Sequence, residues 1–99
     1  MRAQFDVYRL ADRTLVVDVQ SPLASVHATR LVIPLIAMKD ATPSVSRLDP
    51  HVGIDGKPWV LATHFATTVD AKALTVPVAS LAHEERAIKG ALDFLINGF

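Results

Sequence analysis

The longest apolar run in the sequence is Leu31-Val32-Ile33-Pro34-Leu35-Ile36-Ala37-Met38. Its branched side chains predict a buried strand, because such side chains pack well on a pleated sheet. Pro34 has no N–H to donate to a ladder, so we expect it at a sheet edge or at a bulge that bends the strand. The run is far shorter than the ~20 apolar residues that span a membrane.

Two shorter β segments precede this run. Gln4 to Arg9 alternates apolar and polar side chains, which predicts a strand with two unlike faces. Thr14 to Val19 is rich in β-branched residues and predicts a second strand, buried on both faces at Leu15–Val17. Ala11-Asp12-Arg13 between them is typical of a turn, so we expect a hairpin. Gln20 to Arg30 is expected as a loop, either a plain connector or a functional one.

A second hairpin is expected after the apolar run. Asp49–Ile54 and Lys57–Thr63 predict two strands joined by Asp55-Gly56, since glycine accepts a positive φ without steric cost. Trp59 lies in the second strand and is expected to be buried in the sheet. A further weak strand is expected around Leu74–Val76.

The hydrophobic period changes towards the C-terminus. Apolar residues follow three- and four-residue spacing at Leu81, Ile88, Ala91, Leu92, Leu95 and Ile96. This spacing predicts an amphipathic helix of about four turns. We expect Ser80 as its N-cap, Gly90 as a point of close backbone packing, and Asn97-Gly98 as its end.

The order of these elements, several strands and then one helix, lacks the βαβ alternation of parallel sheets. It predicts a mainly β protein with one C-terminal helix, folded as an SH3-like small barrel. The chain has 99 residues, of which 51% are hydrophobic and 20% charged, so we expect one globular domain over residues 1–99 rather than a disordered chain.

Charge and cysteine content narrow the function classes. Ten Lys and Arg residues balance ten Asp and Glu residues, so no net field attracts nucleic acid phosphates. The absence of cysteine excludes disulfides and thiolate metal sites and suits a reducing compartment. The first residues carry no apolar signal segment, so we expect a soluble, cytoplasmic protein with no membrane partner.

The residue inventory gives little support for an enzyme. The sequence has no G-x-S-x-G nucleophile elbow and no glycine-rich phosphate loop. The four histidines, His27, His51, His64 and His83, lack the close spacing of paired metal ligands. We therefore expect no catalytic residue, no metal and no cofactor.

Several segments form a pattern that runs in order along nearly the whole chain. They are Gln4-Phe5-Asp6-Val7-Tyr8, Val17-Asp18-Val19-Gln20-Ser21, Arg30-Leu31-Val32-Ile33-Pro34-Leu35, Val45-Ser46-Arg47-Leu48, Asp55-Gly56-Lys57-Pro58-Trp59, and Val78 to Glu85 running into Ile88-Lys89. The pattern resembles the CcdB family of toxins, and V-D-V-Q-S followed by V-I-P-L is its most specific part. The resemblance implies the barrel-plus-helix fold of CcdB- and MazF-type toxins and a homodimer.

The same resemblance implies a function. It predicts the toxin of a type II toxin–antitoxin module, neutralised by a CcdA-like antitoxin. Members of the family bind the dimerisation domain of the DNA gyrase A subunit and trap the cleaved gyrase–DNA complex. Such a toxin is an inhibitor and makes or breaks no bond itself. A two-fold toxin can present one patch to both halves of a two-fold target.

The resemblance also implies which residues contact gyrase: Asn97, Gly98 and Phe99 at the chain end, Asp93 on the helix, and Leu23 and Ala24 in the loop after V-D-V-Q-S. The family typically ends in Trp-Gly-Ile, so only Gly98 is identical. Asn97 cannot stack on a gyrase arginine as the tryptophan does. Losing that cation–π contact costs ~0.5–2 kcal/mol, and symmetry counts it twice. We therefore expect weakened or altered gyrase activity, with Phe99 as a substitute aromatic.

Two alternatives stay open. Some small barrel toxins are ribonucleases that use an arginine, a histidine or threonine, and an acid, for which Arg30, His51 and Thr63 are the candidates here. The zero net charge counts against this function, because RNA binding normally requires a basic groove. The other alternative is a non-toxic relative that keeps only antitoxin binding.

Overall fold

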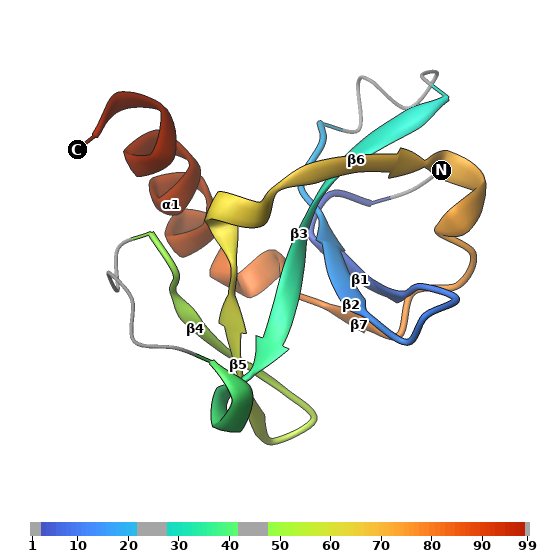
Figure 1. Cartoon of the computed structure of the whole chain (residues 1–99), viewed down its shortest axis with the longest axis horizontal. Helices are drawn as coiled ribbons and strands as arrows, with labels where there is room; N and C mark the ends of the chain where they lie inside the picture. Colours follow the sequence, from blue (N-terminus) through green and yellow to red (C-terminus); the bar gives the residue numbers. More distant parts are fainter. Residues whose placement is uncertain (1–2, 22–27, 42–47, 99) are drawn as a thin grey trace.

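The computed structural model describes residues 3–21, 28–41 and 48–98. In these ranges one antiparallel sheet of seven strands curls into a nearly closed barrel, with a single α-helix beside it (Figure 1). The strands are β1 Asp6–Arg9, β2 Leu15–Asp18, β3 Thr29–Ala37, β4 His51–Ile54, β5 Lys57–Leu61, β6 Thr67–Asp70 and β7 Ala79–Ser80. The helix, α1, spans Glu85–Asn97. The predicted mainly β barrel with a C-terminal helix is confirmed.

The long strand β3 organises the sheet. It pairs with β2 along one side, and along the other side first with β6 and then with β5. The strand order is β4-β5-β3-β2-β1-β7, with β6 joined to β3 alone. Both predicted hairpins are present, and the β4–β5 turn has positive φ at Asp55 and Gly56 (52° and 76°), as expected of an Asp-Gly turn.

The sequence predicts Pro34 at a sheet edge or a bulge, but it lies in the middle of this central strand, so the edge position is wrong. Its carbonyl accepts a hydrogen bond from the Ala62 N–H at 2.9 Å, on the side of β3 that faces β6 and β5. The N–H that proline lacks would point to the same side. There β6 pairs only as far as Val32, and β5 begins to pair at Leu35. Pro34 therefore falls in a gap of the ladder where no donor is needed.

The barrel has two apolar clusters, one on each face of β2. Leu15 and Val17 face the larger cluster, which includes Ile88 of α1, while Val16 faces a smaller cluster with Leu74. The predicted burial of β2 on both faces is thus confirmed. Trp59 is half-buried against the larger cluster, so its side chain is less enclosed than expected.

Two local predictions near the C-terminus are wrong. The helix begins at Glu85 after a 3₁₀ turn, η5 (Ala82–Glu84), and Ser80 is not its N-cap. Instead the Ser80 hydroxyl accepts a hydrogen bond from the Ala82 N–H at 3.2 Å, one turn earlier. The weak strand expected around Leu74–Val76 is also absent. The strand in this region is β6, which ends before a 3₁₀ turn, η4 (Ala71–Ala73). Leu74 follows this turn directly and is buried there.

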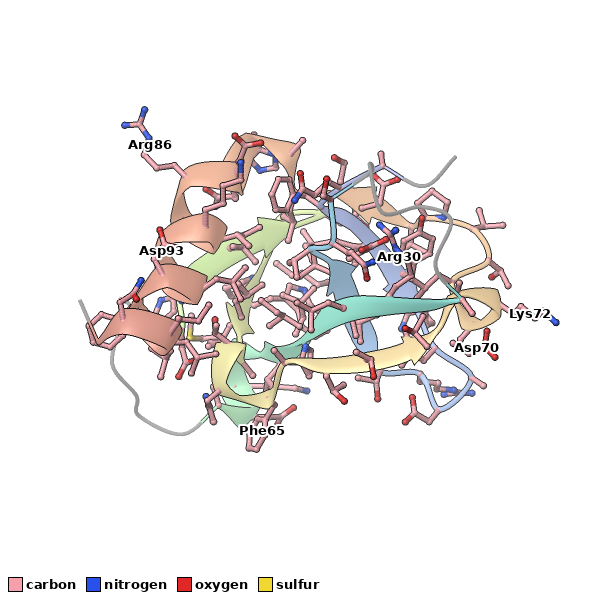
Figure 2. The ribbon with its side chains drawn as sticks, turned by 90° about the horizontal axis from the view of Figure 1, so that it is seen from above. Arg30, Phe65, Asp70, Lys72, Arg86 and Asp93 are labelled. Carbon is pink, nitrogen blue, oxygen red and sulfur yellow. The ribbon has the colours of Figure 1, made fainter. Side chains whose placement is uncertain are left out.

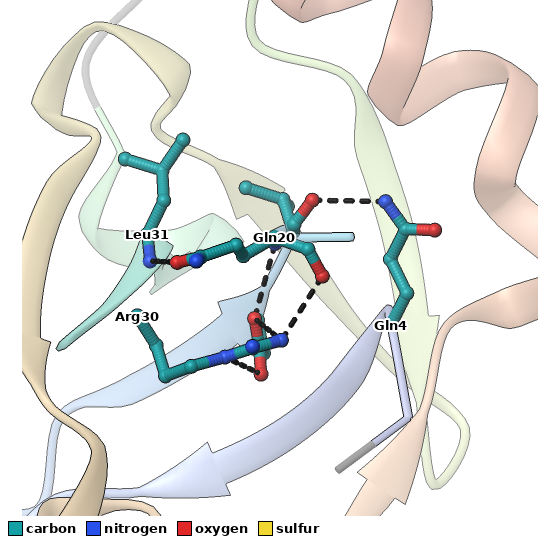
Figure 3. A network of polar contacts seen from close by, with 6 residues as sticks. Gln4, Gln20, Arg30 and Leu31 are labelled. Atoms are coloured by element: carbon teal, nitrogen blue, oxygen red, sulfur yellow. Dashed lines mark hydrogen bonds and ion pairs between the residues drawn. The ribbon is translucent and has the colours of Figure 1, made fainter. Parts of the chain in front are cut away.

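A buried ion pair joins β2 to β3. Arg30 Nε donates to Asp18 Oδ2 at 3.0 Å and Arg30 Nη2 donates to Asp18 Oδ1 at 3.2 Å, with both side chains 0% exposed (Figure 3). Nη2 also donates to the Gln20 carbonyl at 3.0 Å, and the Gln20 side chain accepts the Leu31 N–H at 2.8 Å. These bonds hold residues 18–20 and 30–31 together, where the chain leaves β2 and enters β3.

Replacing Arg30 with methionine should reduce the free energy of unfolding by about 3–5 kcal/mol, because Asp18 would remain buried without its counter-charge. Chemical denaturation in urea measures the loss. The matched control is Lys89→Met, which removes the exposed Lys89–Glu85 pair and should cost less than about 1 kcal/mol. Equal losses in the two variants would contradict a structural role for the buried pair.

Gly90 lies in an exposed part of α1, and a Cβ placed on it would meet no atom within 4 Å. The predicted close backbone packing is therefore wrong. We expect Gly90→Ala to raise the free energy of unfolding by about 0.5–1 kcal/mol, because alanine favours the helix and restricts the unfolded chain. Thermal unfolding measures the gain. A loss would mean that something packs on this face in solution.

The effect of Asp6 on the stability of the fold should change with pH in the opposite direction to that of Asp12. Burial, aided by the nearby Asp18 carboxylate, raises the pKa of Asp6 above its ordinary 3.8, although a backbone hydrogen bond from Ala3 opposes the shift. Ionised Asp6 therefore destabilises the fold above its raised pKa. Asp6→Asn should be more stable than the parent at pH 7, and the difference should vanish as the pH falls below 3.8.

The control for this prediction is Asp12→Asn. Hydrogen bonds from Thr14, including its N–H at 3.0 Å, lower the pKa of Asp12, so ionised Asp12 stabilises the fold at neutral pH and loses this effect in acid. Melting temperatures of both variants across pH 3–7 measure the two trends. Parallel pH profiles for the two variants would contradict the assignment.

Candidate functional site

The C-terminal turns of α1 carry the predicted helix contacts. The helix packs on the barrel through Ile88 and Ala91, which are buried. Asp93 and Asn97 are four residues apart and therefore share one face of the helix, and both are exposed. Figure 2 shows Arg86 and Asp93 on the side of α1 away from the sheet. The structure thus displays Asp93 and Asn97 together to solvent.

Gly98 ends the helix as predicted. Its backbone is left-handed, with φ 77°, and its N–H donates to the Phe94 carbonyl at 2.8 Å. This is the usual way in which glycine closes a helix, because it has no Cβ to clash in that conformation. The cap fixes the direction in which the chain leaves α1, directly after Asn97.

Large apolar side chains are also exposed near the end of α1. Ile96 is 76% exposed and Leu95 43% exposed, although their spacing predicts that they belong to the buried stripe. The C-terminal end of α1 projects beyond the sheet (Figure 1). Phe65, 59% exposed, lies in η3 (Thr63–Phe65), a 3₁₀ turn that contacts α1.

The other three predicted contacts, Phe99, Leu23 and Ala24, lie outside the described residues. Of the predicted site, the structure therefore brings Asp93, Asn97 and Gly98 together at one end of α1.

The three residues considered for a ribonuclease do not form an accessible site. Arg30 and Thr63 are both 0% exposed, and the guanidinium of Arg30 is committed to Asp18. His51 is exposed on β4. That candidate trio is therefore wrong, because two of its three reactive groups, those of Arg30 and Thr63, are enclosed in the barrel.

A polar contact that the sequence did not indicate joins Asp49 to η3. The buried Asp49 Oδ1 accepts the Thr63 N–H at 3.1 Å and lies 3.2 Å from His64 Nδ1. The His64 ring in turn lies against Phe65, with centroids 4.2 Å apart. The contact ties η3 to the chain just before β4. Asp49 and His64 are too far apart in sequence for any local spacing rule to pair them.

The described residues contain no group of three or more His, Cys, Asp or Glu side chains that could hold a metal ion. None of the helices in the described ranges is long and apolar enough to cross a membrane.

Comparison with known families gives one assignment. The family model described as CcdB protein matches residues 4–98, which include every strand of the barrel and all of α1. The match thus spans both the scaffold and the polar end of the helix. This chain belongs to the CcdB protein family.

Proposed function

We propose that this protein is the toxin of a type II toxin–antitoxin module that binds the dimerisation domain of the DNA gyrase A subunit. In this proposal it traps the gyrase–DNA cleavage complex and acts as an inhibitor rather than an enzyme. Membership of the CcdB family supports a toxin of a toxin–antitoxin module. The observation that carries the gyrase proposal is the exposed end of α1, where Asp93, Asn97 and Gly98 meet.

The end of α1 suits a binding surface for physical reasons. The helix is anchored through Ile88 and Ala91, so its last turn needs little ordering when a partner binds. Ile96, the residue before Asn97, adds exposed apolar area at the same end of the helix. Exposed apolar area together with polar groups is typical of a protein-binding site.

We further propose that two copies form a homodimer. Phe65, Leu95 and Ile96 are exposed large apolar side chains on neighbouring elements, and clusters of this kind mark interaction surfaces. A second copy that covered part of this surface would bring two helix ends near one two-fold axis. Both ends could then engage the two halves of a symmetric target.

The replaced C-terminal tryptophan points to weakened or altered gyrase binding. Asn97 is exposed at the position where the family has tryptophan, so it offers hydrogen bonds instead of an aromatic face. Phe99 is the substitute aromatic in this proposal, with Leu23 and Ala24 as the loop contacts. The other expected partner is a CcdA-like antitoxin, a partly disordered chain that folds on the toxin surface in the cytoplasm.

The direct test restores the aromatic side chain. Purified Asn97→Trp and the parent protein are titrated into gyrase and plasmid DNA, and the trapped cleavage complexes are counted. We expect the variant to act at a concentration about ten- to a thousandfold lower, because two cation–π contacts are regained. The matched control is Arg86→Trp, which places the same side chain on the same helix face far from its end.

The alternatives predict other outcomes. Growth arrest with intact gyrase and degraded RNA would support a ribonuclease, and no arrest at all would support a relative that keeps only antitoxin binding. An equal gain from Arg86→Trp and Asn97→Trp would contradict a contact at the helix end.

A further inference from the structure

A groove lies around the β4–β5 hairpin, at the opposite end of the molecule from the C-terminal end of α1. Two adjoining hollows form it, and they share Met38, Lys57 and Pro58. Met38 belongs to η2 (Met38–Asp40), a 3₁₀ turn that contacts β5. Figure 1 shows η2 beside the hairpin, far from the last turn of α1.

The floor of the groove is apolar. Trp59 lines it beside Ala37 and Pro58, and the Trp59 side chain is only half-buried. An indole held by a sheet gives a flat, rigid surface on which a large apolar side chain can pack.

The charged side chains of the groove are basic. Lys39 and Lys57 are both exposed, and neither forms an ion pair with any residue in the described ranges. His51 lines the far end, and none of the lining residues is acidic. Asp40 follows Lys39 in the sequence, and Asp55 lies two residues before Lys57. Neither aspartate lines the groove. The groove therefore favours anionic groups.

The backbone of β4 adds a third feature. Among the described strands β4 pairs with β5 alone, so its other side is a sheet edge. In a hairpin with a two-residue turn, Ile54 and Lys57 exchange the hydrogen bonds next to the turn, and the pairs then alternate. The N–H and C=O groups of His51 and Gly53 consequently point away from β5. They are placed to pair with an added strand.

We propose that this groove binds an extended acidic segment of a protein partner, in which carboxylates flank a large apolar side chain. The apolar side chain packs on Trp59, the carboxylates lie against Lys39 and Lys57, and the backbone pairs with the edge of β4. Because the groove is remote from the end of α1, the segment can bind whether or not that end contacts gyrase. The proposal goes beyond the gyrase proposal and does not depend on it.

The test uses the full chain and two fluorescein-labelled peptides, read by fluorescence polarisation. One peptide alternates glutamate with leucine and phenylalanine, and the other has lysine in place of every glutamate. We expect the acidic peptide to bind at least about tenfold more tightly, with an affinity that falls as salt rises. Amide shifts in NMR spectra should move at His51 and Gly53. Equal binding of the two peptides, or shifts confined to α1, would overturn the proposal.

A second test of the proposal reverses the charges of the two groove lysines. The double variant Lys39→Glu/Lys57→Glu should lose at least about tenfold in affinity for the acidic peptide, since two attractive charges become repulsive. Lys72→Glu is the matched control, because Lys72 is exposed on η4, away from the groove (Figure 2). Both variants change surface residues, and circular dichroism checks their folding. Undiminished binding by a folded double variant would refute the role of the lysines.

Discussion

The buried pair of Asp18 and Arg30 is the constraint on which the rest of the barrel depends. Burying two charges is costly unless each is paired and hydrogen-bonded. Here Arg30 makes a bidentate contact with Asp18 and a further hydrogen bond to the Gln20 carbonyl, which together satisfy most of the buried polar groups. The pair ties the end of β2 to the start of β3, the strand with most neighbours in the sheet. It therefore fixes where the loop between these strands begins and ends.

The nearly closed barrel determines which side chains remain exposed for binding. The larger apolar cluster lies on one face of β2 and anchors α1 through Ile88. The last turn of the helix extends past this support, so its polar and apolar residues remain exposed together. The β4–β5 hairpin leaves a second surface at the other end of the molecule. The two proposed binding surfaces therefore lie on opposite parts of one scaffold.

Much of the fold could be predicted because local patterns and tertiary packing agree. β-branched runs became strands, Asp-Gly became a tight turn, and the doubly apolar β2 is buried on both faces. The errors lie where long-range contacts decide the outcome. Leu74 is buried by neighbours distant in sequence rather than by a strand, and Pro34 is tolerated because its two partner strands leave a gap. The burial of Arg30 depends on Asp18, twelve residues earlier. The exposure of Ile96 depends on where the sheet stops, which periodicity cannot reveal.

The central claim is that the last turn of α1 contacts the gyrase A subunit. Hydrogen exchange of the full chain, alone and with the gyrase A dimerisation domain, tests this claim most directly. The account predicts slower exchange of the backbone amides from Asp93 to Gly98 in the complex, with the β4–β5 hairpin unchanged. Unaltered exchange at the helix end, or protection confined to the hairpin, would contradict it.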